Sequence, residues 1–578
     1  MPNRTLTRIF TIIGLFIALL PLQAQNIIRP KIAGPDGLWV NSYNGVLFFG
    51  QTDMETQNTR MPMQLRFYYN SSAQSTNYGY GLGFSLGFEM RYRINAIDGI
   101  EIETGDGRTD TYARYGKDYV APAGVFSSVK EYEYNKFVLT EKSGEKYYFD
   151  DPKHGKVTSI VDRYGSRTTF VYEDSMLVKI TDAVGHTIDF VYTDGMMTKA
   201  TASFHKGSIT YEYDGLHRLK KRIDAMGNTT IYGYDKFNRI NEITDANGNK
   251  TLIAYNNGGM VSRMKTAVSD KSIRYEGDKT VFIDYTAPQN QYSYYRWDDK
   301  GRAIEKVGLC CGIQSKLEYD DNDNVVKRTD ANGNITTYTY DERGNMLSMT
   351  DVHGNSELYT YEKEFNNVTS FTDKNGNQYR FSYDGKGNLL SITGPLGFSN
   401  SFTYNDKGWQ LTATDANGNV TSTTYNEDGT TRETMDAAGN TVAYTYDSNG
   451  NILSLTDGMK NVTAYTYDEN NRITAQTDAL GNTTTVSYDK VGNIVRVMNA
   501  KNQITAYTYD ALGNLLTQTD PMGGVYTYTY DGKGNILSVK DPVGDVQTFT
   551  WNEKNKLLSQ TNAAGEILEH ITVWLEHR

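Results

Sequence analysis

One phrase, repeated every 21 residues along most of the chain, limits the folds open to this sequence. It reads YTYDSNGNILSLTDGMKNVT at 444–463 and YTYDENNRITAQTDALGNTT at 465–484. A fixed period of this length is typical of repeat architectures, in which each unit is one supersecondary element. The second aromatic residue of successive copies is spaced by 21, with one gap of 22: Tyr319, Tyr340, Tyr361, Tyr383, Tyr404, Tyr425, Tyr446, Tyr467, Tyr488, Tyr509, Tyr530 and Trp551.

A weaker copy of the same period precedes this series. Its aromatic positions are spaced by 20 to 22 residues: Tyr172, Tyr192, Tyr213, Tyr234, Tyr255, Tyr275 and Trp297. The two series together predict a repeat array over residues 151–566.

Each unit is expected to form one β-hairpin. Val462–Tyr467 alternates and is rich in β-branched and aromatic residues, and Ile473–Thr477 is a second short apolar run, so both predict strands. Asp468–Asn471 and Asp478–Asn482 carry turn residues, and Gly481 can take a positive φ at little cost. Asn-Gly and similar pairs in these turns favour the primed types of hairpin turn. The array shows no helical periodicity.

The signature residues of the phrase can be explained without a ligand. Tyr465 and Tyr467 share one face of a strand, because strand side chains alternate. A tyrosine suits a half-wet wall, with its ring packed and its hydroxyl reaching water. The aspartate that follows accepts hydrogen bonds from the amides of its turn. The predicted structural residues are Tyr340, Tyr446, Tyr467, Tyr509, Tyr530, Asp341, Asp447, Asp468, Asp510 and Asp531.

The predicted fold class is therefore all-β, with tandem hairpins in one very long sheet. Some 18 hairpins follow one another, and a flat open sheet of that length is unusual because strands twist. The sheet is expected to coil into a spiral or a partial hollow shell.

The first residues are typical of a secretory signal rather than of a folded domain. Arg4 and Arg8 precede the apolar run Ile9–Leu20, and Ala24 is the expected cleavage position. The run is too short to span a bilayer, and no later segment is apolar enough to do so. Residues 1–24 are assigned as a signal peptide, and the mature chain is expected to be secreted, periplasmic or attached to the cell surface.

Charge and cysteine usage exclude some classes of function. The net charge of −11 argues against a nucleic-acid partner, which requires a basic surface. Cys310 and Cys311 are adjacent, and they are interpreted either as two buried or turn-located thiols or as a candidate vicinal disulfide. The seven histidines are scattered, without the spacing of metal ligands. No cofactor is expected.

Two motifs suggest chemistry, and both have simpler readings. GFSLG (83–87) fits the nucleophile elbow of hydrolases, which requires a strand–turn–helix. Ser85, however, lies in a region with β composition. The DANGN stretches that begin at Asp330 and at Asp415 match half of a calcium loop, but the twelfth position is not Glu in either of these two. We interpret these two stretches as turns, with weak calcium binding as the alternative. No catalytic or metal residue is assigned.

The phrase YTYDERGNMLSMTD (338–351) resembles the repeat of the RHS/YD-repeat family, which includes rearrangement-hotspot, wall-associated and teneurin-like proteins. The stretches MPMQLRFYYNSS (61–72) and YGYGLGFSLGFEM (78–90) are similar to the segment that precedes the repeats in bacterial members. Residues 25–150 are accordingly assigned as an N-terminal β-rich segment of RHS type. The resemblance implies a hollow β-shell that encloses a toxin domain or displays surfaces for cell contact and carbohydrate binding.

The last residues depart from the family pattern. The next aromatic residue is due near position 572, which is Thr572, and residues 567–578 form an irregular tail without the family's Asp-Pro-rich motif. We therefore expect a truncated chain, a reading frame that continues elsewhere, or a relative without a toxin.

Three functions follow from these features. The first is an exported, non-enzymatic scaffold for cell contact or for encapsulating a toxin domain absent from this chain. The second is a carbohydrate-binding adhesin on the cell surface, with Trp409 and Trp551 as candidate sugar contacts. The third is a truncated polymorphic toxin.

Overall fold

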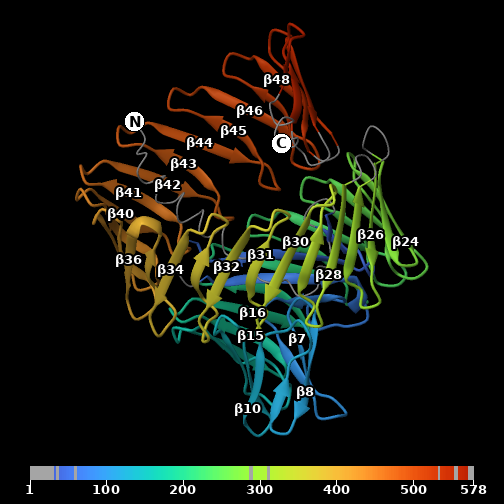
Figure 1. Cartoon of the computed structure of the whole chain (residues 1–578). Helices are drawn as coiled ribbons and strands as arrows, with labels where there is room; N and C mark the ends of the chain where they lie inside the picture. Colours follow the sequence, from blue (N-terminus) through green and yellow to red (C-terminus); the bar gives the residue numbers. More distant parts are fainter. Residues whose placement is uncertain are drawn as a thin grey trace.

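The computed structural model consists almost entirely of antiparallel strands (Figure 1). It describes residues 31–33, 38–57, 62–285, 291–308, 313–531, 534–551 and 557–569. The signal-peptide prediction for residues 1–24 and the candidate disulfide of Cys310 and Cys311 lie outside these residues. The only helical elements among the described residues are the short 3-10 turns η2 (Ser71–Ala73) and η3 (Pro395–Gly397). In the part of the chain that is described, no helix is long and apolar enough to cross a membrane.

A small N-terminal sheet, here called the plug, is formed by five strands in sequential order. They are β1 (Lys31–Ala33), β2 (Trp39–Asn41), β3 (Leu47–Glu55), β4 (Gln64–Asn70) and β5 (Phe84–Leu86).

All remaining strands form one continuous sheet, here called the wall, in which each strand pairs antiparallel with the next in sequence. The upstream wall comprises β6 (Arg91–Ile94), β7 (Ile100–Glu103), β8 (Thr109–Tyr115), β9 (Asp118–Val120), β10 (Ser128–Glu133), β11 (Lys136–Thr140), β12 (Lys146–Phe149), β13 (Ser159–Val161), β14 (Arg167–Glu173), β15 (Met176–Thr181), β16 (Thr187–Thr193), β17 (Met196–Ala202), β18 (Ser208–Tyr213), β19 (Leu219–Ile223), β20 (Thr229–Tyr234), β21 (Ile240–Thr244), β22 (Lys250–Tyr255), β23 (Val261–Lys265), β24 (Asp270–Glu276), β25 (Lys279–Asp284), β26 (Gln291–Trp297) and β27 (Ala303–Gly308).

The downstream wall contains the regular repeats. It comprises β28 (Ile313–Tyr319), β29 (Val325–Thr329), β30 (Ile335–Tyr340), β31 (Met346–Thr350), β32 (Ser356–Tyr361), β33 (Val368–Thr372), β34 (Gln378–Tyr383), β35 (Leu389–Thr393), β36 (Ser399–Tyr404), β37 (Gln410–Thr414), β38 (Val420–Tyr425), β39 (Thr431–Met435), β40 (Thr441–Tyr446), β41 (Ile452–Asp457), β42 (Val462–Tyr467), β43 (Ile473–Thr477), β44 (Thr483–Tyr488), β45 (Ile494–Met498), β46 (Ile504–Tyr509), β47 (Leu515–Thr519), β48 (Val525–Tyr530), β49 (Ile536–Lys540), β50 (Val546–Trp551), β51 (Leu557–Thr561) and β52 (Ile567–Glu569).

The predicted hairpins are confirmed, but the turn type is different. In the turn after β43, the amide of Gly481 donates to the carbonyl of Asp478, and the amide of Asp478 donates to the carbonyl of Asn482. Only Gly481 has a positive φ, of 82°. This is a type I turn followed by a left-handed residue, whereas a type I′ turn needs positive φ at both central residues. The Asp side chain favours this outcome, because it caps the turn from its first position.

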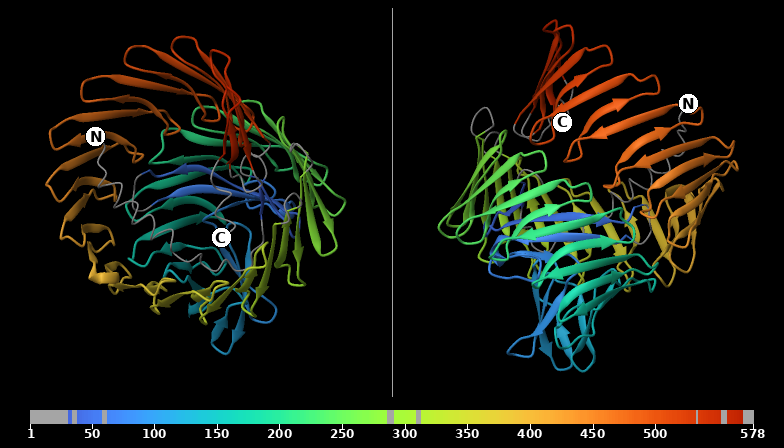
Figure 2. Two further views of the ribbon diagram at one scale, coloured as in Figure 1. Left: turned by 45° about the horizontal axis from the view of Figure 1, so that its top comes forward. Right: turned by 180° about the vertical axis from the view of Figure 1, so that it is seen from behind.

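A bulge recurs in each regular hairpin and contributes to the curvature of the wall. Tyr467 pairs with Ile473 while Thr466 pairs with Ala475, so Thr474 is the extra residue. Bulges increase local twist and bend the strand that carries them. The predicted coiling is confirmed: the wall winds around the plug as an open spiral (Figure 2). Among the described strands, no pairing joins β52 with β6.

Two coils of the spiral meet along a seam of turns. The side-chain amide of Asn366 donates to Lys142 O at 3.0 Å, that of Asn470 to Asp224 at 2.7 Å, and that of Asn247 to Asp489 at 3.0 Å. These pairs are 224, 246 and 242 residues apart in sequence, which is the length of one coil. The seam therefore holds neighbouring coils of the open spiral together through polar contacts between loops.

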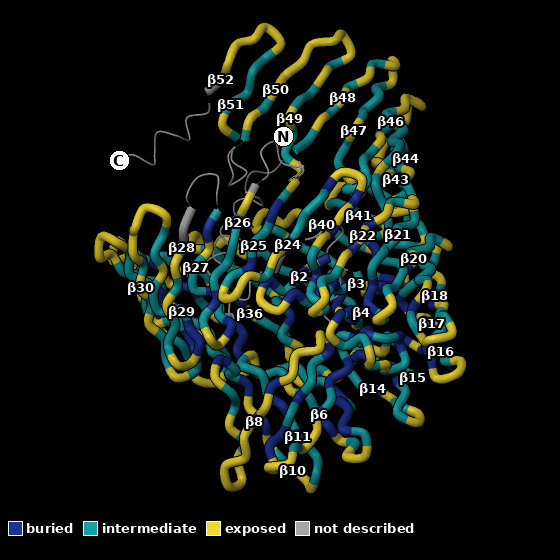
Figure 3. The backbone as a smooth tube through the Cα atoms, turned by 90° about the vertical axis from the view of Figure 1, so that its right-hand side faces the viewer, coloured by how far each residue is buried: buried dark blue, intermediate teal, exposed yellow. Residues whose placement is uncertain are grey.

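The core lies between the plug and the upstream wall. Phe49 stacks on Tyr232 and Phe67 packs on Tyr211, with ring centroids 6.5 and 5.3 Å apart. Asp53 of β3 is buried and accepts from Arg222 Nε at 2.6 Å and from the Tyr211 hydroxyl. Figure 3 shows buried backbone concentrated around the plug strands, while the hairpins from β46 to β52 are intermediate or exposed.

Candidate functional site: the repeat face and its pocket

The second tyrosine of the repeat does not leave its hydroxyl in water. The Tyr467 hydroxyl donates to the carbonyl of Ile452 at 2.9 Å, and Ile452 begins the second strand of the preceding hairpin. The same bond recurs for Tyr340 to Val325, Tyr361 to Met346, Tyr446 to Thr431, Tyr488 to Ile473 and Tyr509 to Ile494. Each such bond contributes about 1 kcal/mol. The tyrosine thus ties successive hairpins together.

Burial makes these phenols harder to ionise. It raises the pKa of Tyr340 to about 12 and that of Tyr446 to about 12. The pKa of Tyr509 is raised by burial in the same direction, and so is the pKa of Tyr530 at the end of β48. The hydroxyls therefore remain hydrogen-bond donors across the physiological pH range.

The aspartate after each tyrosine is occupied by its own turn. Asp468 Oδ1 accepts from the amides of Asn470 and Arg472 at 3.0 and 2.9 Å, and its Oδ2 accepts from Arg472 Nε at 2.7 Å. Four aspartates at the same repeat position accept hydrogen bonds from the backbone amide and the side-chain amide of the Asn four residues later. They are Asp341, Asp447, Asp510 and Asp531.

The DANGN turns have the same geometry. Asp330 accepts from the amides of Asn332 and Asn334 and from the Asn334 side chain, at 2.8 to 2.9 Å. Asp415 makes the equivalent set of bonds with Asn417 and Asn419. No group of three or more metal-binding side chains occurs among the described residues. The turn interpretation explains these carboxylates fully.

Ser85 lies inside β5 and its hydroxyl donates to the Gly105 carbonyl at 2.7 Å. The strand–turn–helix context of a hydrolase nucleophile does not occur there, since β5 is followed by a turn and then by β6.

The two tryptophans suggested as sugar contacts differ in surroundings. Trp409 is only 7% exposed and packs on Tyr425, with Lys407 over its ring. Its faces are therefore covered, which does not favour stacking on a sugar. Trp551 is partly exposed, and its indole nitrogen donates to the Ile536 carbonyl at 2.7 Å, in place of the tyrosine hydroxyl. The carbohydrate role stays a prediction.

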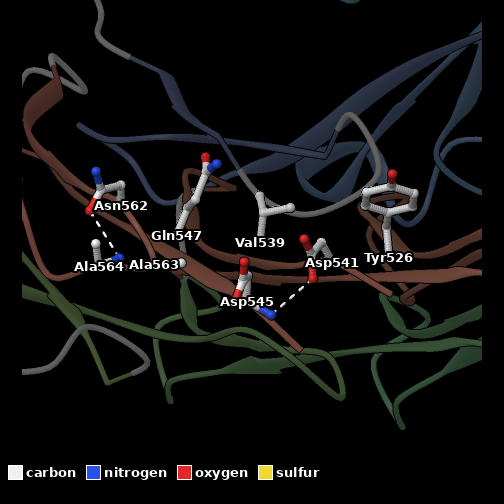
Figure 4. Close-up of a pocket in the computed structure, with 8 residues that line it drawn as sticks. All are labelled: Tyr526, Val539, Asp541, Asp545, Gln547, Asn562, Ala563 and Ala564. Atoms are coloured by element: carbon white, nitrogen blue, oxygen red, sulfur yellow. Dashed lines mark hydrogen bonds between the residues drawn. The ribbon is translucent and has the colours of Figure 1, made fainter. Parts of the chain in front are cut away.

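A pocket that sequence reasoning missed lies at the C-terminal part of the downstream wall. Its volume is about 670 Å³. Tyr526, Val539 and Gln547 come from three adjacent strands and project to the same side of the sheet (Figure 4). The other lining residues belong to the two neighbouring turns: Asp541, Asp545, Asn562, Ala563 and Ala564. Tyr526 stands where other repeats have Thr463, Thr484 or Thr505, and this third aromatic in YTYTY was the available signal.

The fold and the repeat face together define a β-hairpin repeat protein, with a coiled wall wrapped around an N-terminal plug. The RHS repeat family model matches residues 213–250, 319–356, 364–399, 425–458, 446–484, 467–504, 488–525, 509–546 and 530–567. A second model, a domain of unknown function (DUF6531), matches residues 37–112. The chain belongs to the RHS/YD-repeat family.

Comparison with solved structures finds components of toxin complexes at low similarity. The Photorhabdus luminescens Tc holotoxin pore, with a mutant TccC3, is 12% identical over 89% of this chain and 30% of that chain, with a TM-score of 0.41. The TcdB2–TccC3–Cdc42 structure is 13% identical over 96% and 33%, with a TM-score of 0.40. This chain thus spans about a third of their length. Among curated proteins, the comparison finds no match.

Proposed function

We propose that this protein is an exported, non-enzymatic RHS scaffold that holds a partner against the plug-facing side of its wall. The partner would be a neighbouring-cell surface component or a toxin domain that is not part of this chain. One observation carries the proposal. Tyr211 and Tyr232, the first tyrosines of their repeats, face the plug and are 3 and 4% exposed. Tyr444, Tyr465 and Tyr507 occupy the same repeat position in the downstream wall and are only half-buried.

The repeat register makes this difference meaningful. The same position of the same hairpin faces the same side of the sheet throughout the array, because side chains alternate with period 2. The plug covers this side of the upstream wall. From β40 onward, half-buried aromatic residues continue on that side, and aromatic surface of this kind is enriched in contact sites. The acidic net charge favours a neutral or basic partner over a nucleic acid.

The test compares the two sides of one strand. A photo-crosslinking amino acid is placed at Tyr507 or at its neighbour Thr508, which points to the opposite side, in the full chain expressed in its own cells. We expect a defined adduct from position 507 and none from position 508. Equal labelling at both positions, or none at either, would refute the proposal. N-terminal sequencing of the extracellular or periplasmic protein tests the export step, with cleavage after Ala24 expected.

The pocket favours carbohydrate as a second candidate partner. It combines an aromatic ring from Tyr526, an amide from Gln547 and the carboxylate of Asp545, which are groups that stack on and hydrogen-bond to sugars. We expect the full chain to bind on a glycan array. Binding should be lost in Tyr526→Ala and in Gln547→Ala, and kept in Thr529→Ala, which lies on the other side of the sheet. Binding that survives both pocket substitutions would rule out this site.

A further inference from the structure

A buried Glu–Lys pair lies where the plug connection meets the upstream wall. Glu89 is in the connection between β5 and β6, and Lys156 precedes β13. An isolated bridge between Arg91 and Lys156, and a bond from the amide of Val157 to the Met90 carbonyl at 2.9 Å, hold the two segments side by side. The side chain of Glu89 is 0% exposed and that of Lys156 is 10% exposed. Bulk water therefore has little access to the pair.

The surroundings of Glu89 satisfy one carboxylate oxygen and not the other. Oε1 lies 2.5 Å from Lys156 Nζ and 3.3 Å from a guanidinium nitrogen of Arg91. Oε2 is buried and accepts no well-formed hydrogen bond from the described residues, although the Tyr80 hydroxyl lies close to the carboxylate. A buried charged oxygen without a well-formed hydrogen bond is destabilising. A carboxylate, with two acceptor oxygens, is thus poorly matched to this site.

The surroundings of Lys156 are equally selective. Its Nζ lies 2.5 Å from the Ser175 carbonyl, and it sits over the Tyr172 ring, 4.9 Å from the centroid. Among the described residues, the Ser175 carbonyl is thus the one acceptor for this nitrogen besides Glu89. One satisfied oxygen and one satisfied N–H are the hydrogen-bonding capacity of a secondary amide.

We propose that Glu89 and Lys156 condense to an intramolecular isopeptide bond. Lys156 Nζ bonds to the carboxyl carbon of Glu89, the bond from that carbon to Oε2 breaks, and two protons of the ammonium leave with this oxygen as water. Atoms and charge balance between the ion pair and the neutral amide plus water, so the step needs no oxidant or co-reactant. The retained oxygen keeps its contact with Arg91, and the remaining N–H keeps its acceptor at Ser175.

Proximity and exclusion of water favour this step. Groups held in contact react with effective molarities of about 10⁵–10⁸ M when the geometry is right. Tyr80 is 1% exposed and lies against Glu89, and burial followed by the charge of Glu89 raises its pKa, so it is present as a neutral phenol. Tyr80 and Arg91 are positioning residues, placed to stabilise charge that develops on the carboxyl group.

The bond would brace the start of the spiral. It joins residues that are 67 positions apart and fastens β6, the first strand of the wall, to the segment before β13. The two cysteines of the chain are adjacent and do not provide such a link between distant segments. A covalent tie of this kind constrains the unfolded chain as a disulfide does.

Peptide mapping of the full chain by mass spectrometry tests the proposal. We expect one branched tryptic peptide that contains both Glu89 and Lys156, lighter than the sum of its two parts by one water, and resistant to reduction. Lys156→Arg keeps the positive charge but supplies no amine, so its digest should contain only the two linear peptides. Separate linear peptides with intact Glu89 and Lys156 in the wild-type digest would overturn the proposal. This outcome needs no variant and is independent of whether Lys156→Arg folds.

Discussion

Substitution of Asp53 by Ala should release the plug from the wall. Asp53 Oδ1 is 2.6 Å from Arg222 Nε, and the two side chains are 1 and 15% exposed. Removing one member of a buried ion pair leaves the other charge uncompensated and costs about 3–5 kcal/mol. The Tyr211 hydroxyl also loses its acceptor, because it donates to Oδ2 of the same carboxylate. The expected loss is therefore at the upper part of this range.

Hydrogen exchange followed by mass spectrometry is the suitable assay, because stability in a repeat protein is local. Peptides from β3 and from β18–β19 should exchange at least about 100-fold faster in Asp53→Ala, since 1.4 kcal/mol is a factor of ten. The control is Asp189→Ala. Asp189 pairs with Lys179 at 3.2 Å on the surface, and such pairs contribute about 0–1 kcal/mol.

A double variant separates charge from packing. Asp53→Leu with Arg222→Met removes both charges and keeps the volume apolar, which is often neutral or stabilising. It should recover most of the protection that Asp53→Ala loses. The reasoning fails if Asp53→Ala exchanges within about threefold of the wild type, or if Asp189→Ala has as large an effect.

Three further predictions concern the repeat. Tyr467→Phe removes the bond to the Ile452 carbonyl and should cost about 1 kcal/mol of local stability, read as faster exchange in β41 and β42; no change would show that the tie is dispensable. Gly481→Ala places a side chain at φ 82° and should destabilise its hairpin by about 1 kcal/mol. Lys460→Gly relieves a residue at φ 67° and should stabilise the turn after β41. Stability shifts of the same sign in the two variants would contradict the turn assignment. Hydrogen bonding from the Asn482 side chain lowers the pKa of Asp478, so its contribution is present above pH 3.8 and is lost as the pH falls through the lower folded pKa. Pepsin should therefore cut residues 473–488 more readily as the pH falls below 3.8, and Asp478→Asn should flatten this dependence; identical pH profiles would refute it.

Local features of the repeat were readable from the sequence because each is determined by a few neighbouring residues. The alternation in Val462–Tyr467 predicts a strand, and the turn residues of Asp468–Asn471 and Asp478–Asn482 predict turns, so the all-β hairpin array is recovered. The type of turn was missed because the aspartate cap of Asp478 outweighs the Gly-Asn pair. The tyrosine tie was missed for another reason: the acceptor is a backbone carbonyl 15 residues away, which no side-chain pattern reveals.

Contacts between distant segments had no sequence signal. Asp53 and Arg222 are 169 residues apart, and Asn247 and Asp489 are 242 apart. Such pairs follow from the curvature of the whole wall, which is the sum of many small twists. The pocket was missed because it requires the register of three strands, although the extra aromatic Tyr526 marked it. The functional predictions that depend on partners remain proposals, and so do the predicted domain boundaries. At the boundary predicted near residue 151, β12 pairs with β13, so the sheet continues across it.

The central claim is that the wall is one coiled sheet that returns to itself after one coil of the spiral. Site-directed disulfide formation between Asn247→Cys and Asp489→Cys tests it most directly, with Cys310 and Cys311 replaced by Ser. The two side chains are in contact across the seam, with Asn247 Nδ2 at 3.0 Å from the Asp489 carboxylate. Mild oxidation should give a cross-linked loop within one chain, seen as a mobility shift on a non-reducing gel. The pair Asn247→Cys and Asp478→Cys, with the second residue at the opposite rim, should give none. Failure of the first pair, or equal linking of both pairs, would contradict the spiral.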